Sequence, residues 1–531
     1  MPKPEGGGGT NVETPDVVKP DDNQNTEPTK SDVTQLSQIN FASKNEYTLK
    51  ADIALPDNYS VGKVNCTIVG DGNKLVLGKG VTLGELNGNI SDLTVENSGN
   101  TIFTSISENA SIKNVIFNVN ADITSTDGRA FVALNNYGTI DGVTLNASGK
   151  INVISTSTVD TYGGMVLNNS YKVNAAAQMI YNGVIKNCKV NYSRFTLVGV
   201  AGANASFGGV VGTNNAYLQD CVVSGEIIGD TFDIAGICSV NNGLLSGNVN
   251  EANLSQTSVD TGWNPIVCGI VMTNAYAVDN CENKGSITAI SNCEVEESEE
   301  NKPTVSAAGI AYVNSSTIVN CINSGSITAK GNYASYVGGI AAHSYTQIGN
   351  CLSSGDITVT AQDVYVGGIL GISEVTNRGY YVYFGSVNSC ISESKIDVSV
   401  IGNEPAYVGG IIGCVSEAGF GSEDDLVYFG GGATNCYFIG ECVSDVTYFG
   451  NIVGVCGANI YESNSYTSGN TEYHNFEDNY YLQNSYKSIG STVSSDGTFA
   501  PAENKGATRT TIEEIKNNET YKKILSALVV D

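Results

Sequence analysis

The sequence is poor in positive charge and in histidine. Its 531 residues include 26 Lys and Arg, 54 Asp and Glu and two His, which gives a formal net charge of −28. Negative charge on this scale disfavours nucleic acid, anionic membranes and polyanionic substrates, and it favours neutral or cationic partners. His343 and His474 are 131 residues apart, and His343 is expected to be an ordinary turn residue. A catalytic site built on histidine is therefore not predicted.

Long apolar runs and clustered metal ligands are missing as well. No segment is long enough to span a bilayer, so contact with a membrane is expected only through an N-terminal anchor. The 14 Cys include no close C-x-x-C pair, which argues against a zinc site, and no cofactor is predicted. An acidic run at residues 294–300 is expected to be a solvated turn, with weak calcium binding as the alternative.

Glycine is abundant, with 61 copies, and much of it recurs in a doublet: a Gly or a small substitute, a Gly, and two small apolar residues. Copies of this doublet begin at residues 163, 208, 235, 268, 308, 338, 367 and 409. A cysteine follows the second Gly by 12 residues in four copies, as from Gly309 to Cys321, although the repeat period varies from 27 to 45 residues. A fixed spacing inside a variable period predicts an all-β solenoid whose strands keep register while its loops vary.

Two columns of equivalent residues follow from this repeat. Parallel strands stack about 4.8 Å apart and point equivalent side chains the same way, so we expect the repeated cysteines to be reduced and buried. The asparagine before most of them is expected to form a structural ladder, because Asn tolerates left-handed turn conformations. The cysteines are Cys188, Cys221, Cys281, Cys321, Cys351, Cys390 and Cys436, and the asparagines are Asn187, Asn280, Asn320, Asn350 and Asn435.

The succession Gly-Gly-Ile-x-Gly, an Asn-rich turn, Ile-x-Asn-Cys and Gly-x-Ile resembles the GLUG-motif repeats of bacterial surface and secreted proteins, over roughly residues 90–485. The resemblance implies a right-handed parallel β-helix, export and often adhesion, and it brings no set of catalytic residues. On this basis we expect a monomer located outside the cell or on the bacterial surface, with a lipid anchor as one route of attachment.

Four segments are predicted along the chain. Residues 1–31 have the composition of a disordered tether, and residues 32–85 are expected to be an N-terminal β cap with the first strands. Residues 86–485 should form about eleven coils, and residues 486–531 a loop and a short helix. That helix is expected to begin at the capping box of Thr511 and Glu514 and to cap the last rung, or else to dock a further module or partner.

Three coils lengthen the stretch between doublet and cysteine, at residues 164–188, 368–390 and 410–436. Insertions on one face of a solenoid are frequently its binding face, and these three are rich in aromatic residues. Packing of the inserted loops onto the solenoid is the structural alternative. The candidate ligand-binding residues are Tyr171, Tyr181, Tyr380, Tyr381, Tyr383, Phe384, Phe420, Tyr428 and Phe429.

A further row of tyrosines, two residues before the doublet, consists of Tyr336, Tyr365, Tyr407 and Tyr448. Strand alternation places these rings inside the solenoid unless the chain bends at the Gly pair. On the outside they would instead form a flat platform for sugar rings or protein surfaces.

These observations favour a non-catalytic, adhesin-like protein that binds a glycan or a host or matrix protein through its inserted aromatic loops. The competing hypothesis is a glycosidase or lyase that acts on a neutral polysaccharide. Glu226 and Asp356 share one repeat position, but Ser286 and Ser326 hold it in the intervening clear coils, which argues against a carboxylate pair. A passive stalk is the third hypothesis.

Overall fold

The structure is a computed structural model. It describes residues 27–97, 99–124, 129–152, 160–173, 178–180, 183–199, 205–258, 264–294, 302–378, 381–420, 427–443, 446, 448–457, 472–473, 476–482, 484, 486–493, 499–500 and 504–528. Residues 1–26 of the predicted tether and most of the acidic run lie outside these residues, whereas Lys30 and Ser31 of the predicted tether already belong to a strand.

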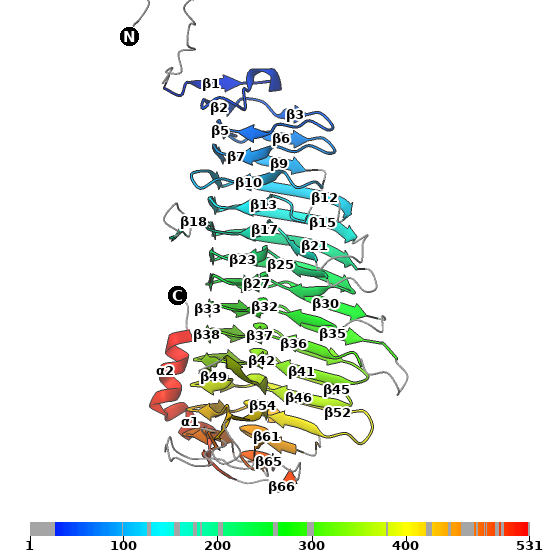
Figure 1. Cartoon of the computed structure of the whole chain (residues 1–531), viewed down its shortest axis with the longest axis vertical. Helices are drawn as coiled ribbons and strands as arrows, with labels where there is room; N and C mark the ends of the chain where they lie inside the picture. Colours follow the sequence, from blue (N-terminus) through cyan, green and yellow to red (C-terminus); the bar gives the residue numbers. More distant parts are fainter. Residues whose placement is uncertain are drawn as a thin grey trace, which may run out of the picture.

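The chain folds into one elongated stack of β-rungs (Figure 1). Strands of successive rungs pair in parallel, so the rungs build long sheets that run along the axis of the stack. Among the described residues, the first and second sheets have 15 strands each. A third face contains many parallel strands, and a fourth sheet has nine strands. This architecture confirms the predicted all-β parallel β-helix. The sheets run from β1 (Lys30–Val33) to β63 (Phe476–Glu477), from β4 (Lys63–Val64) to β66 (Phe499–Ala500), from β3 (Ile53–Leu55) to β67 (Ala507–Thr510) and from β16 (Asp160–Gly163) to β60 (Tyr448–Gly450).

Strand alternation explains why the stack has a continuous core. In β6 (Lys74–Leu77), exposed and buried positions alternate. Pairing in register repeats that alternation from rung to rung, so that Ile90 lies against Ile112. One apolar cluster consequently runs from Val33 to Ile489 along the inside of the solenoid.

The predicted cysteine and asparagine columns are both present. All seven column cysteines are buried, and their thiols form no disulfide. The column asparagines have φ between 52° and 55°, which is the left-handed turn conformation. Asn350 donates from Nδ2 to Oδ1 of Asn320 at 2.6 Å, and Asn320 donates to Oδ1 of Asp279 at 2.8 Å. Buried thiols beside a structural amide ladder are thus confirmed.

A second amide ladder lies inside the solenoid, where no sequence signal singled it out. Each side chain in it is fully buried, and from Asn136 to Asn274 each Nδ2 donates to the Oδ1 of the next rung at 2.8 to 2.9 Å. The last member, Asn314, donates from Nδ2 to Oγ of Ser344 at 3.0 Å. Asn214 also donates to the carbonyl oxygens of Ala216 and Leu244, both at 3.3 Å. The ladder therefore satisfies buried amides while it ties each turn to the next rung. Its members are Asn136, Asn169, Asn214, Asn241, Asn274 and Asn314.

The solenoid starts earlier than predicted. The region expected to be a cap already contributes β1, β2 (Glu46–Leu49) and β5 (Thr67–Val69) to the first sheet, so it consists of rungs. The stack consequently contains more rungs than the eleven expected. These early rungs lack the Gly doublet that marks the later ones, which is why the repeat does not reveal them.

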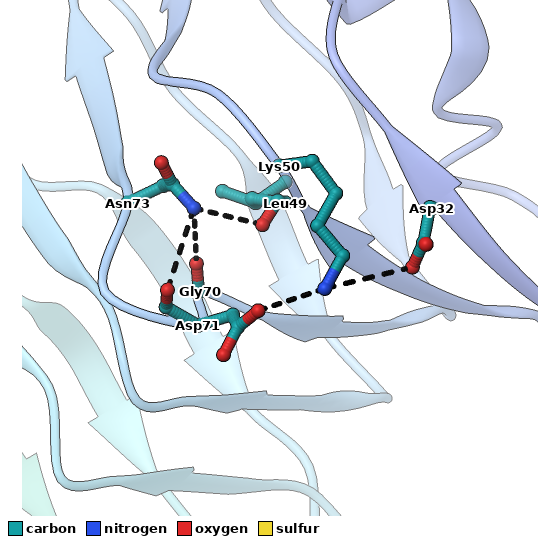
Figure 2. A network of polar contacts seen from close by, with 6 residues as sticks. All are labelled: Asp32, Leu49, Lys50, Gly70, Asp71 and Asn73. Carbon is teal, nitrogen blue, oxygen red and sulfur yellow. Dashed lines mark hydrogen bonds and ion pairs between the residues drawn. The ribbon is translucent and has the colours of Figure 1, made fainter.

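Polar side chains tie these first rungs together at one turn (Figure 2). Lys50 Nζ lies 2.8 Å from Oδ2 of Asp71 and 3.9 Å from Oδ1 of Asp32. Asn73 donates from Nδ2 to the carbonyl oxygen of Leu49 at 2.8 Å. Because the ion pairs are exposed and worth little, the amide bond to the backbone is the firmer link between these rungs.

The C-terminal segment is more ordered than predicted. The loop expected between residue 486 and the C-terminal helix contains β65 (Ile489–Val493), which continues the second sheet. The capping box is confirmed, since Glu514 N donates to Oγ1 of Thr511 at 3.3 Å and Thr511 N donates to Oε2 of Glu514 at 3.0 Å. Two helices follow, α1 (Ile512–Asn517) and α2 (Glu519–Leu528).

Helix α2 lies along the side of the stack and does not cap its last rung (Figure 1). Its buried residues Tyr521, Ile524 and Leu528 pack against outward-facing residues of the third face. Those residues belong to five consecutive rungs, so the predicted cap over the end is wrong and the helix covers a lateral apolar stripe. The stripe consists of Ile322, Leu352, Ile391, Tyr437 and Tyr480. Of the helices in the described chain, none is long and apolar enough to cross a lipid bilayer.

The Gly doublets mark a sharp corner between the fourth and second sheets. A Cβ on Gly338 would lie 1.7 Å from the carbonyl oxygen of Ala341, which belongs to the strand after the corner. A Cβ on Gly339 would lie 2.0 Å from the carbonyl oxygen of Gly368 in the next rung. Neither position leaves room for a side chain, so the doublet allows the chain to bend and the rungs to stack closely.

Candidate ligand-binding surface

All three predicted insertions fold into antiparallel hairpins between the second and first sheets. The hairpins are β18–β19, β48–β49 and β55–β56. Because each insertion follows the same strand position of its rung, the hairpins emerge from the same corner of the solenoid. Their strands are β18 (Lys172–Val173), β19 (Met179–Ile180), β48 (Val375–Arg378), β49 (Tyr381–Phe384), β55 (Glu417–Phe420) and β56 (Val427–Gly430).

The predicted aromatic residues are distributed over these hairpins. Tyr383 is 41% exposed, and Phe384 and Tyr171 are half-buried. Tyr181 and Tyr380 lie outside the described residues. Tyr381 belongs to β49, Phe420 to β55, and Tyr428 and Phe429 to β56.

The two later hairpins meet, and the first one stands apart from them. Strand β48 contacts β55, and β49 contacts β56. Strand β56 pairs in addition with β62 (Glu472–Tyr473), so that Phe429 lies opposite Tyr473. The second and third insertions thus form one surface, which we call the hairpin surface and define as residues 375–378, 381–384, 417–420, 427–430 and 472–473. The five rungs between β17 (Val166–Asn169) and β47 (Leu370–Ser373) separate the first insertion from it.

The tyrosine row lies on the outside of the solenoid, which corrects the interior placement. In β41 (Ala334–Gly338), Ser335 and Val337 are buried in the core while Tyr336 is half-buried on the outer side. The chain bends at the Gly pair, so strand alternation does not carry through to the following Ile. Tyr365, Tyr407 and Tyr448 follow in register on the next rungs.

The rings of this row stack on one another. Centroids of Tyr336 and Tyr365 are 4.9 Å apart with planes 13° from parallel, and Tyr365 and Tyr407 are also 4.9 Å apart at 25°. Tyr407 and Tyr448 are 6.1 Å apart at 13°. Both faces of an inner ring are therefore covered by its neighbours, which leaves ring edges for solvent. The row cannot offer the flat faces on which sugar rings stack, so the platform interpretation is not supported.

His343 closes the upper end of the tyrosine row. It lies in β42 (Ala341–Ser344) and not in a turn, and its ring centroid is 4.6 Å from that of Tyr336 and 5.3 Å from that of Tyr312. Its Nδ1 lies 3.1 Å from Oε1 of Glu374. Burial raises the pKa of the Tyr336 hydroxyl, and the nearby charge of Glu374 raises that pKa further. These groups form a packed polar and aromatic corner.

The carboxylates do not form the pair that glycoside hydrolysis needs. Glu226 pairs in register with Asn253, and the register places Asp356 three rungs beyond Asn253. At about 4.8 Å per rung, Glu226 and Asp356 are roughly 19 Å apart, beyond the distance at which two carboxylates flank one glycosidic bond. A third carboxylate, Asp233, lies on the fourth sheet, at the strand position that Tyr336 occupies three rungs further along.

Within the described part of the chain, no group of three or more His, Cys, Asp and Glu side chains could hold a metal ion. The acidic run considered for calcium lies mostly outside that part, so the calcium alternative stays a prediction.

Comparison with known proteins adds little. The chain matches no family model and no curated protein. Among solved structures, a Bacteroides ovatus protein provisionally named an immunoglobulin A1 protease is similar, with 13% sequence identity over 85% of this chain and 84% of that chain and a TM-score of 0.17. A TM-score of this size carries no argument, so the fold assignment rests on the strand pairing.

Proposed function

We propose that the chain is a non-catalytic, adhesin-like binding protein of the bacterial surface, which recognises a glycan or an extracellular host or matrix protein through the hairpin surface. The observation that supports this proposal is that insertions at one repeat position fold into hairpins, two of which are in contact. A solenoid needs no such hairpins to stack its rungs. A passive stalk would leave them without a role.

The chemistry of the surface supports recognition by aromatic side chains. Tyr383 is exposed in β49, and aromatic side chains provide large contact areas at little cost in conformational entropy. The net charge of −28 favours a neutral or cationic ligand. The wide separation of Glu226 and Asp356 makes a polysaccharide-degrading activity the weaker alternative.

The test is binding of the full chain to arrays of neutral glycans and extracellular-matrix proteins. In the test variant, Tyr380, Tyr383, Tyr428 and Phe429 are changed to Ala. The matched control is Tyr276→Ala, because Tyr276 is 56% exposed and lies outside the hairpins. We expect selective binding that the test variant loses at least tenfold and the control keeps. Equal binding by both variants, or release of reducing sugar from a bound glycan, would contradict the proposal.

A further inference from the structure

A groove lined by both polar and apolar groups lies on the outer side of the third face, near the N-terminal end of the solenoid. It has a volume of about 600 Å³, which is within the usual range of small-molecule sites. Its walls come from β6, β9 (Thr94–Asn97), β12 (Ile116–Thr124), β15 (Thr144–Asn152), β21 (Lys189–Val198) and β25 (Val222–Asp230). Val76 and Leu77 of β6 add apolar surface at one end. The groove is about five rungs, or roughly 24 Å, from the hairpin surface.

The groove exists because three consecutive strands bend at the same place. Gly149 has a φ of 110°, Arg194 of 52° and Gly225 of 100°, and the strand register shifts beside each of them. A Cβ on Gly225 would lie 1.9 Å from the carbonyl oxygen of Tyr192, so the bend requires glycine there. Bulges of this kind redirect side chains, and here they turn a flat face into a concave one.

An outer amide ladder lines the groove. It consists of Asn118, Asn146, Asn191 and Ser224, which pair in register on successive rungs. Asn146 donates from Nδ2 to Oδ1 of Asn118 at 2.8 Å, Asn191 donates to Asn146 at 2.8 Å, and the Ser224 hydroxyl donates to Asn191 at 2.8 Å. These bonds fix the orientation of every amide along the groove.

The outer ladder keeps hydrogen-bonding capacity that the interior ladder uses up. An amide side chain has two N–H donors and two acceptor lone pairs on its oxygen. Among the described residues, Asn146 donates once and accepts once, and both partners are side chains. Asn214 of the interior ladder bonds the backbone of its turn as well. Asn146 and Asn191, the two middle residues of the outer ladder, therefore each keep one donor and one acceptor available to a ligand.

The groove carries almost no net charge. Glu96 is the one charged residue among its lining residues, and its Oε1 accepts from Nζ of Lys74 at 3.1 Å. Asn120, Ser148 and Ser193 add further amide and hydroxyl groups beside the ladder. Regularly spaced donor and acceptor pairs without charge complement the hydroxyl groups of an uncharged sugar chain.

We propose that this groove binds an uncharged oligosaccharide, whose hydroxyl groups exchange hydrogen bonds with Asn118, Asn146 and Asn191. The site is independent of the hairpin surface and of its function. The sugar chain lies along the ladder, because the amides repeat in that direction at the strand spacing.

The test is calorimetric titration of the full chain with cellohexaose, xylohexaose, maltohexaose and mannohexaose, with hexagalacturonate as the anionic comparison. We expect at least one neutral hexasaccharide to bind, and hexagalacturonate to bind at least tenfold more weakly. The double variant Asn146→Val, Asn191→Val should lose at least tenfold in affinity. The control Asn242→Val should not, because Asn242 forms a similar exposed amide pair with Asn215 away from the groove.

A second variant, which leaves the outer ladder intact, separates loss of binding from loss of folding. Asn120 is exposed at the edge of the groove, so Asn120→Arg should fold normally and obstruct the site. Circular dichroism and the thermal transition verify that each variant is folded. The proposal is overturned if no neutral hexasaccharide binds at millimolar concentration, if hexagalacturonate binds as well as the neutral sugars, or if folded groove variants bind like the wild type.

Discussion

Asn241 donates a hydrogen bond from Nδ2 to Oδ1 of Asn274 at 2.9 Å, and neither side chain is exposed to solvent. Asn241 also accepts from Gly243 N at 3.2 Å. Replacing Asn241 by Leu would remove one hydrogen bond each from the buried amides of Asn214 and Asn274 and would take away the acceptor of the buried Gly243 N–H, each at about 1 to 3 kcal/mol. We expect Asn241→Leu to lower the free energy of unfolding by about 3 to 5 kcal/mol in urea titrations. The adjacent, exposed Asn242→Leu should change it by less than about 1 kcal/mol, and equal effects would contradict this account.

The second glycine of a doublet should resist substitution, because it faces the backbone of the next rung. Gly339→Ala would place a methyl group 2.0 Å from the carbonyl oxygen of Gly368, so the rungs would have to separate. We expect a loss of at least about 3 kcal/mol, measured by urea denaturation, or a failure to fold. Gly62→Ala is the control, because its Cβ would meet no atom within 4 Å. Similar stability of the two variants would show that the corner can relax.

Stacking should make Tyr365 important for stability. Tyr365→Ala removes contacts with Tyr336 and Tyr407, and we expect a loss of about 2 to 4 kcal/mol in the free energy of unfolding. Tyr365→Phe keeps both stacks and should cost less than about 1 kcal/mol. If the phenylalanine variant were as unstable as the alanine variant, the hydroxyl and not the stacking would be the stabilising group.

Asp233 should make the fold less stable as the pH rises. Burial raises the pKa of its carboxyl group well above the ordinary value, and its Oδ1 has no hydrogen-bond partner within the described structure. In the unfolded chain the group titrates near pH 3.9, so above that pH the folded state binds more protons and the free energy of unfolding falls until the folded pKa is passed.

Asp233→Asn removes this titration. We therefore expect the stability of the variant relative to the wild type to increase between pH 4 and pH 7, measured as urea midpoints at each pH. A difference that does not change with pH would show that the Asp233 carboxyl titrates alike in both states.

The regular spacing of the repeat made the stacked rungs predictable, whereas the placement of the tyrosine row depends on a local irregularity of the strand. The 12-residue interval from Gly309 to Cys321 reveals the rungs because two short strands, β37 (Ala311–Asn314) and β38 (Thr317–Val319), and the turn between them set its length. The chain bends at Gly338, and this bend breaks strand alternation. Alternation alone therefore predicted, wrongly, that the ring of Tyr336 lies inside the solenoid.

The groove and the position of helix α2 could not be predicted from the sequence for a different reason. Asn118 and Asn146 are 28 residues apart, and Asn146 and Asn191 are 45 apart, so these partners follow no visible period. Helix α2 shows its apolar positions in the sequence. The stripe that it covers is assembled from five rungs and becomes recognisable only when these rungs are stacked.

The placement of α2 also bears on how the protein responds to force. Solenoid rungs contact only their neighbours and can peel away one at a time from a free end. Tyr437, the fourth of the five stripe residues, stacks on Tyr480, meets Tyr521 of the helix edge-on, and donates from its hydroxyl to Asn518 at 2.8 Å. A pull on the C-terminus has to shear the helix off five rungs before the first of them can unzip, so α2 acts as a mechanical latch at the end that carries the hairpin surface.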